Sequence, residues 1–254
     1  MADHPVTGAP RSRRRAGGVG GRRLGGRRLM KSPHAPRPGT DDLLVAGARA
    51  LGLHLTSTQV AAFATYLKEI TRWSARTNLT ALRRPEDIVR AGFLDSLACL
   101  PLIPLEADRA VDVGSGAGFP GLPLKLARPE ISFTLVEASR KKATFLQHVA
   151  RRLGLVGVRV VQRRAEELAA DPGEAGAYDL ALARAVAPPP DQGRLVQPFL
   201  RPGGLFLAQT GPGPLAPETM EHLAGLGFEA VRELSLPARL GRPGCRVLAL
   251  RRTA

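Results

Sequence analysis

The sequence predicts an α/β fold built on a seven-stranded, mostly parallel sheet. From residue 109 onward, short apolar runs alternate with helical segments, a pattern that favours parallel strands joined by crossover helices. A chain of 254 residues with 44% hydrophobic residues can bury a core of this size. We expect this α/β domain over 106–254, preceded by a small helical cap over 41–105 and a basic tail over 1–40.

The strands are expected where β-branched and aliphatic residues cluster between turn residues. The predicted strands are Ala110–Val113, Ser132–Val136, Val158–Val161, Leu180–Ala183, Leu205–Ala208, Ala230–Leu234 and Val247–Leu250. Helices are expected to begin near Pro120, Ser139 and Gln192, and Gly154 should end the second of them.

The cap is predicted from helical spacing and a capping signal. Thr56 and Gln59 form a capping box, and apolar residues then recur from Val60 to Ile70 at the spacing of one buried helical stripe. A shorter helix is expected over Asp41–Leu51, and another should run through Ile88–Leu100.

The tail carries much of the positive charge. The chain has a formal net charge of +15, and residues 1–40 hold ten of its 37 Lys and Arg residues but one of its 22 acidic residues. We expect this tail to be disordered because it lacks apolar periodicity. It is either an RNA-binding arm or a solvated extension ahead of an alternative start at Met30.

Composition also restricts the compartment and the chemistry. No apolar run is long enough for a membrane span and no secretory h-region is visible, so we expect a soluble, cytoplasmic protein. Cys99 and Cys245 have no metal-ligand spacing, which predicts two core thiols and no metal site.

The segment that carries most chemical information runs from Val111 to Gly121. A strand enters a turn with glycine at positions 114, 116 and 118, and Pro120 suits the first turn of the helix that follows. Glycines let a ligand approach the backbone closely, and a helix N-terminus offers N–H groups to polar atoms. The spacing departs from the GxGxxG fingerprint of dinucleotide enzymes.

A carboxylate ends the next predicted strand. Glu137 follows Thr134-Leu135-Val136, where an acid can accept hydrogen bonds from both ribose hydroxyls of an adenosine. Together with the glycine turn it favours an adenosine-containing ligand.

At this point the chain resembles a known family. The segment from Val111 to Glu130 is similar to that of the glucose-inhibited division protein B (RsmG) family, and the resemblance extends over residues 41–251. Further matches occur in the family's order: Trp73 with Asn78-Leu79-Thr80, Phe93-Leu94-Asp95-Ser96, Arg164-Ala165-Glu166-Glu167 and Ala183-Arg184-Ala185.

The resemblance implies a Rossmann-like class I methyltransferase. Its cofactor would be S-adenosyl-L-methionine. It would methylate N7 of a guanine in small-subunit (16S) ribosomal RNA, either as free RNA or in the assembling small subunit, and it would act as a monomer. Gly114, Gly116, Gly118, Phe119, Glu137, Ala165 and Glu166 would bind the cofactor. Arg184 would face the methionine end and the reacting centre, as a catalytic and cofactor-binding residue, or else form a surface ion pair.

Several positions leave alternatives open. Asn78 and Asp95 either serve the site or cap a turn or helix. Gly92, Thr210 and Cys245-Arg246 stand where the family commonly has histidine, lysine, and arginine followed by a polar residue. Two other functions are therefore considered: a methyltransferase acting on a small molecule or protein, and a non-catalytic RNA-binding homologue.

Phosphate contacts are expected from basic residues of the folded part. They position RNA without specifying its sequence. The candidates are Arg83, Arg84, Arg128, Arg140, Lys141 and Lys142.

Overall fold

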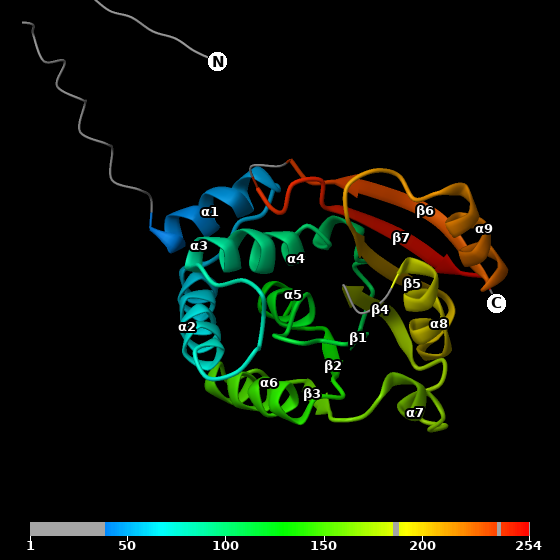
Figure 1. Cartoon of the computed structure of the whole chain (residues 1–254), viewed down its shortest axis with the longest axis horizontal. Coiled ribbons are helices and arrows are strands. Elements are labelled where there is room, and N and C mark those ends of the chain that lie inside the picture. Colours follow the sequence, from blue (N-terminus) through cyan, green and yellow to red (C-terminus); the bar gives the residue numbers. More distant parts are fainter. Residues whose placement is uncertain (1–38, 185–187, 238–239, 254) are drawn as a thin grey trace, which may run out of the picture. The chain divides into compact units, whose positions relative to one another are not determined.

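A computed structural model describes residues 39–184, 188–237 and 240–253. The expectations for the tail lie outside these described residues. Within them the sheet has the strand order β3-β2-β1-β4-β5-β7-β6 (Figure 1). The strands are β1 Arg109–Val113, β2 Ser132–Val136, β3 Val158–Val161, β4 Tyr178–Arg184, β5 Leu200–Thr210, β6 Phe228–Ser235 and β7 Arg246–Arg252.

The predicted mostly parallel sheet is confirmed. Strands β1 to β5 pair in parallel, whereas β7 is antiparallel to both β5 and β6. Two predicted strands match the observed bounds, and β5 begins five residues earlier than predicted because Leu200 pairs with Tyr178 ahead of a register shift.

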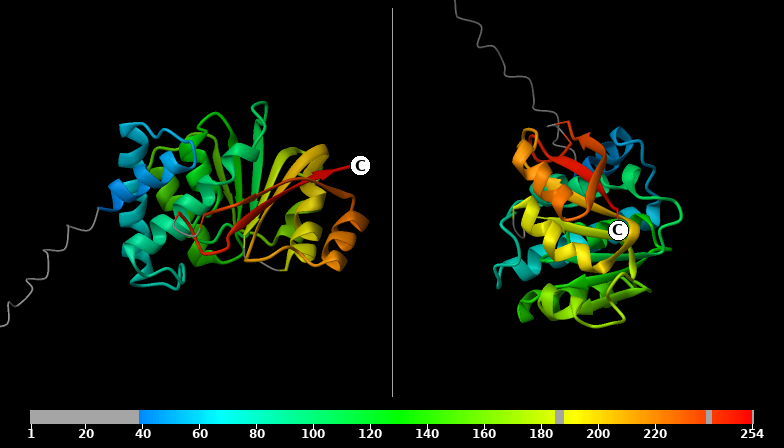
Figure 2. Two further views of the ribbon diagram at one scale, coloured as in Figure 1. Left: turned by 90° about the horizontal axis from the view of Figure 1, so that it is seen from above. Right: turned by 90° about the vertical axis from the view of Figure 1, so that its right-hand side faces the viewer.

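Helices cover both faces of the sheet (Figure 2). Along each strand, alternate side chains enter two different cores, as the two-residue period of a strand requires. Ala110 and Leu182 join a core with α1, α2, η1, α5 and α6, while Val111 and Ala183 join a core with α7, α8 and α9. These helices are α1 Thr40–Ala50, α2 Ser57–Ser74, η1 Ile88–Leu94, α5 Gly121–Ala127, α6 Arg140–Arg152, α7 Ala165–Ala169, α8 Pro189–Val196 and α9 Pro217–Gly225.

The capping signal of α2 works as its sequence predicts. The Gln59 backbone N–H donates to Thr56 Oγ1, and the Thr56 N–H donates to Gln59 Oε1 at 2.9 Å. The amide nitrogen of Gln59 also donates to the carbonyl of Leu126, which joins α2 to α5. Tyr66 in α2 is also fully buried.

The segment after Pro85 differs from the single regular helix expected there. A short α3 (Pro85–Asp87) leads into η1, which is a π-helix, and then into α4 (Asp95–Leu97) and a 3-10 turn η2 (Leu100–Leu102). η1 is seven residues long, and its turns are wider than those of an α-helix. It lies against the glycine turn, where Gly92 approaches Phe119. π-turns within helices are frequent at functional sites.

Among the described residues, no helix combines the length and the apolar character that crossing a bilayer demands.

Candidate functional site

A cleft of about 520 Å³ opens at the carboxyl ends of β1, β2 and β4. This volume suits a drug-sized ligand, and the carboxyl edge of parallel strands is where open α/β sheets bind ligands. The cleft is lined by Leu79, Thr80, Val113, Gly114, Ser115, Gly116, Ala117, Phe119, Val136, Glu137, Ala138, Lys142, Arg163, Arg164, Ala165, Glu166, Arg184 and Leu195.

The glycine turn forms the floor of the cleft. Gly114 and Gly116 both have positive φ angles, +71° and +58°, which favour glycine. A Cβ on Gly116 would meet no atom closer than the Gly114 carbonyl oxygen at 3.8 Å. The absence of a side chain there therefore leaves open space, into which a ligand can come close to the backbone.

Gly118 has a different neighbour from the other two glycines. Among the described residues it does not line the cleft, and a Cβ there would come within 2.4 Å of the Tyr66 hydroxyl. That hydroxyl donates to the Ala117 carbonyl at 2.5 Å. Gly118 thus permits α2 to pack against the turn, and its predicted cofactor contact stays a prediction.

Glu137 lies beside the turn, as the sequence predicts. Its Oε2 accepts from the Gly116 backbone N–H at 2.9 Å, and its Oε1 accepts from the Ser139 N–H at 2.8 Å. Each carboxylate oxygen can accept a second hydrogen bond, so the group can still receive two hydroxyls. The backbone contacts fix the carboxylate in one orientation at the wall of the cleft.

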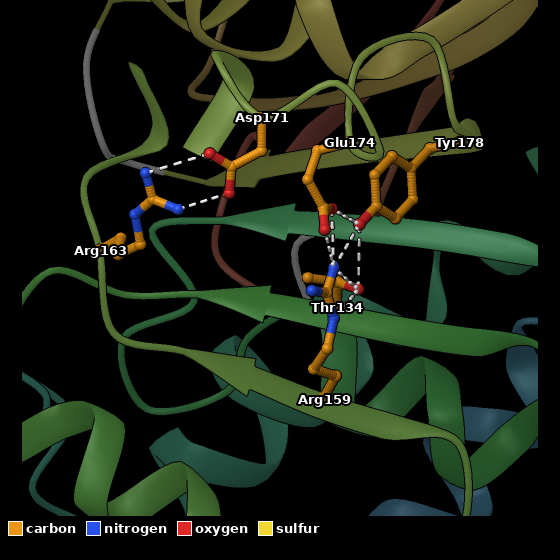
Figure 3. Close-up of polar contacts among 6 residues, drawn as sticks. All are labelled: Thr134, Arg159, Arg163, Asp171, Glu174 and Tyr178. Atoms are coloured by element: carbon orange, nitrogen blue, oxygen red, sulfur yellow. Dashed lines mark hydrogen bonds and ion pairs between the residues drawn. The ribbon is translucent and has the colours of Figure 1, made fainter. Parts of the chain in front are cut away.

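The start of α7 also lines the cleft, through Ala165 and Glu166. Two ion pairs hold the surrounding segment (Figure 3). Arg163 donates to Asp171 at 2.5 Å, just beyond the end of α7. Further along the chain, Arg159 from β3 donates a hydrogen bond to the Glu174 carboxylate at 2.7 Å, and this contact lowers the pKa of Glu174.

The same cluster ties the α7 connection to the sheet. The Arg159 guanidinium donates to the Tyr178 hydroxyl at 2.9 Å, and that hydroxyl lies 3.1 Å from Thr134 Oγ1 in β2. Burial raises the pKa of Tyr178, so its proton stays available for donation. Side chains from β2, β3 and β4 thereby hold Glu174, in the segment between α7 and β4, against the sheet (Figure 3).

Arg184 ends β4 and points to the same face of the sheet as Leu182, towards η1. Its Nη1 donates to the Ala91 carbonyl at 2.8 Å, and its guanidinium carbon lies 5.0 Å from the centre of the Phe119 ring. It also lines the cleft. Within the described residues the Ala91 carbonyl takes one of the five guanidinium N–H donors, which leaves other donors for a ligand in the cleft.

Asp95 serves neither as a helix cap nor as a cleft residue. It is fully buried, and its carboxylate accepts from the Arg242 Nε at 2.6 Å and the Arg242 backbone N–H at 3.0 Å. Gln209 donates to the Asp95 carbonyl at 2.6 Å. This cluster joins α4, β5 and the segment before β7. Asn78 accepts from Arg83 at 3.4 Å, outside the residues that line the cleft.

Asp112 lies beneath the glycine turn with no exposed surface. Its Oδ2 accepts from the Gly121 N–H at 3.0 Å, whereas Oδ1 is buried without a hydrogen-bond partner among the described residues. Burial raises the pKa of this carboxyl to about 7. The group is therefore readily protonated, which reduces the cost of the unpartnered oxygen.

The lining of the cleft carries more positive than negative side chains: Lys142, Arg163, Arg164 and Arg184 against Glu137 and Glu166. Of the phosphate contacts predicted from sequence, Lys142 reaches the cleft. Arg128 lies at the opposite edge of the sheet, where it donates to the Leu105 carbonyl and forms an ion pair with Glu130.

Sequence reasoning missed part of the cleft. Leu79 and Thr80 enter from the loop after α2, about 35 residues before the glycine turn, and no periodicity in the sequence connects them with it. Arg163 could have been inferred, since it follows the end of β3, a strand that the sequence predicted to the residue.

Comparison with known proteins identifies the family of the chain. Residues 59–241 match the family described as GidB, rRNA small subunit methyltransferase G. The chain belongs to this family. A ribosomal RNA small subunit methyltransferase G from Deinococcus deserti is 46% identical over 72% of this chain and 74% of its own length. One from Roseiflexus castenholzii is 45% identical over 79% of this chain and 80% of its own.

Solved structures agree on the fold of this rRNA methyltransferase family member. The cyclase SpnF gives a TM-score of 0.53 at 18% identity, covering 78% of this chain and 96% of its own. A structure from Klebsiella pneumoniae described as an O-methyltransferase gives 0.52 at 16% identity, covering 74% and 89%. The Rossmann-like methyltransferase fold is thereby confirmed.

The family departures lie in three different environments. A Cβ on Gly92 would come within 2.6 Å of the Phe119 ring, so a larger side chain requires the ring to move. Thr210 ends β5 opposite Arg246, away from the described cleft residues. Cys245 is buried, 3.8 Å from the Arg242 guanidinium, and burial raises its pKa to about 11.

Proposed function

We propose that this family member transfers a methyl group from S-adenosyl-L-methionine to N7 of a guanine in small-subunit (16S) ribosomal RNA. One observation carries the proposal: Gly114 and Gly116, which have no side chains, and the carboxylate of Glu137 line the same cleft. The family match supports the rRNA substrate class.

The residues present fit the cofactor. Glu137 keeps acceptor capacity for two ribose hydroxyls, and Gly116 leaves space where a side chain would otherwise project. Ala165 and Glu166 would contact the adenine, and Arg184 would bind the methionine carboxylate. When bound, S-adenosyl-L-methionine supplies an electrophilic methyl group on a positively charged sulfur.

The proposed reaction needs no general base. Guanine N7 has an in-plane lone pair and no proton, so it can form the new carbon–nitrogen bond directly. The electron pair of the broken carbon–sulfur bond stays on sulfur, and the positive charge moves to the guanine.

Rate acceleration would come from holding the reacting atoms in line. Correct positioning of two reactants can contribute roughly 7 to 11 kcal/mol at the extreme. Arg184 suits cofactor binding better than guanine binding, because a cation beside the developing cationic ring would raise the barrier. The proposed partner is small-subunit rRNA or the assembling subunit, bound by a monomer in the cytoplasm.

The test is methyl transfer from radiolabelled S-adenosyl-L-methionine to unmodified small subunits and, separately, to naked 16S RNA. Methylation at N7 is detected because borohydride and aniline cleave the RNA strand at that modification. We expect label in 16S RNA and strand cleavage at the labelled guanine. Label in RNA without cleavage would exclude N7, and label in protein or a small molecule would favour another substrate class.

A further inference from the structure

A second, smaller pocket lies on the helical side of the molecule, beside the cleft. Its volume is about 230 Å³, and it is lined by Arg72, Trp73, Arg76, Thr77 and His148. Trp73 is half-buried at the end of α2, and His148 belongs to α6. The pocket therefore combines an aromatic wall with two exposed guanidinium groups.

The aromatic wall is held rigidly. The Trp73 ring packs edge-on against Phe145 at 5.5 Å between ring centres and lies 5.3 Å from the His148 ring. His148 Nε2 lies 2.9 Å from the Oε2 of Glu69, a largely buried carboxylate that fixes the imidazole orientation. The Trp73 carbonyl accepts from the Thr77 N–H at 2.9 Å, which holds the pocket rim.

The two arginines have no carboxylate partner in the described part of the chain. Arg72 and Arg76 are both exposed and form no ion pair with any described residue. Arg72 lies in the last turn of α2 and Arg76 in the turn just after it, and both line the same pocket, so their guanidinium groups can meet adjacent anionic groups. Arginine beside an aromatic ring is a recurring combination for nucleobases and their phosphates.

Two chain segments connect this pocket with the cleft. Thr77 lines the pocket while Leu79 lines the cleft, and two residues span at most about 7 Å. On α6, His148 lines the pocket and Lys142 the cleft, six residues or about 9 Å apart along the helix. A single strand that enters the cleft can thus reach the pocket within a few nucleotides.

We propose that the Trp73 pocket binds an unpaired base of the RNA substrate close to the methylated guanine, with Arg72 and Arg76 on its phosphates. This inference rests on the proposed function, because it assumes an RNA substrate. RNA fits better than an acidic peptide, since a peptide would use the arginines and leave the aromatic wall unused.

Trp73 is the only tryptophan in the chain, so its fluorescence reports on this pocket alone. The probe is a short single-stranded oligoadenylate, with S-adenosyl-L-methionine alone as the ligand control. Stacking of a base on Trp73 should quench its emission, and the cofactor should leave it unchanged. The same titration is run with a poly-glutamate peptide, and greater quenching by this peptide than by the RNA would overturn the inference.

The variants separate charge from packing. Arg72→Gln with Arg76→Gln should lower RNA affinity about tenfold and reduce the slope of log affinity against log salt by about 2. Trp73→Leu should lower affinity about 5- to 100-fold. Arg232→Gln with Arg251→Gln is the matched control, because both arginines are exposed at the far edge of the sheet and should leave affinity unchanged.

Methyl transfer to small subunits is measured on the same proteins. The Arg72 and Arg76 double variant should raise the KM for RNA with little change in kcat. If the wild type methylates 16S RNA but neither quenching nor KM depends on these residues, the pocket inference fails and the proposed function stands. If the wild type transfers no methyl group to RNA, the proposed function fails and the pocket inference fails with it.

Discussion

Replacing Arg242 with alanine should be among the most destabilising changes outside the hydrophobic core. Asp95 has no exposed surface, and its carboxylate is paired with the Arg242 guanidinium at 2.6 Å. Removing one partner of a buried pair leaves an uncompensated charge, at a typical cost of about 3–5 kcal/mol.

Two structural features reduce this cost. The Arg242 backbone N–H would still donate to Asp95 Oδ1, and the Arg242 side chain is 38% exposed, so water can reach part of the vacated site. We therefore expect Arg242→Ala to lower the free energy of unfolding by about 2–3 kcal/mol. For a protein of this size, that corresponds to a fall in Tm of about 4–12 °C.

Urea denaturation monitored by circular dichroism measures the effect, and the m-value should stay unchanged. The control is Arg84→Ala, because the Arg84–Glu86 pair is exposed on both sides and should contribute less than about 0.5 kcal/mol. Adding Asp95→Asn to Arg242→Ala should restore about 1 kcal/mol or more, since a neutral amide is easier to bury. Equal stability of Arg242→Ala and Arg84→Ala would refute the reasoning.

Four further outcomes are expected. Gly116→Leu should abolish cofactor binding in calorimetry, because its side chain would fill the open space beside the turn. The φ of +58° disfavours a side chain, so the change should also lower the free energy of unfolding by about 1–2 kcal/mol. Unchanged affinity would contradict the assignment. Gly118→Ala should cost more stability than Gly116→Ala in the same denaturation assay, because its Cβ would collide with the Tyr66 hydroxyl. Arg184→Ala should weaken cofactor binding at least tenfold in calorimetry, and a wild-type affinity would remove Arg184 from the site. Asp112 holds its proton in the folded state up to about pH 7, whereas an unfolded aspartate releases it near pH 4, so its contribution to stability falls as pH rises through this window. The stability of Asp112→Asn relative to wild type should therefore rise by up to about 4 kcal/mol between pH 4 and pH 8, and parallel pH profiles would contradict the raised pKa.

Local sequence patterns were sufficient for the sheet and for much of the cleft. Ser132–Val136 could be predicted to the residue because its apolar and β-branched residues lie between Pro129-Glu130 and the charged Glu137. Glu137 and the glycine turn follow from the same logic, since a ligand at the carboxyl edge of a sheet must touch whatever ends the strands.

What the sequence could not show depends on contacts between distant segments. The π-helix η1 lies where Gly92 approaches the Phe119 ring, 27 residues away. The spacing of apolar residues within one helix cannot predict a contact between segments so far apart. The partner of Asp95 is 147 residues away at Arg242, so an interpretation as a helix cap was equally reasonable. Gly118 looked equivalent to Gly116 because both sit in one motif, and the neighbouring Tyr66 distinguishes them.

The position of Phe119 also links the cap helices to the sheet. Its ring contacts Arg184 from β4, and its centre lies 5.9 Å from that of Tyr66 in α2 and 5.9 Å from that of Phe93 in η1. The cap helices and the sheet therefore complete one shared core instead of two adjoining ones. We therefore expect a ligand bound in the cleft to slow hydrogen exchange in α1 and α2 at those amides whose exchange requires the shared core to open.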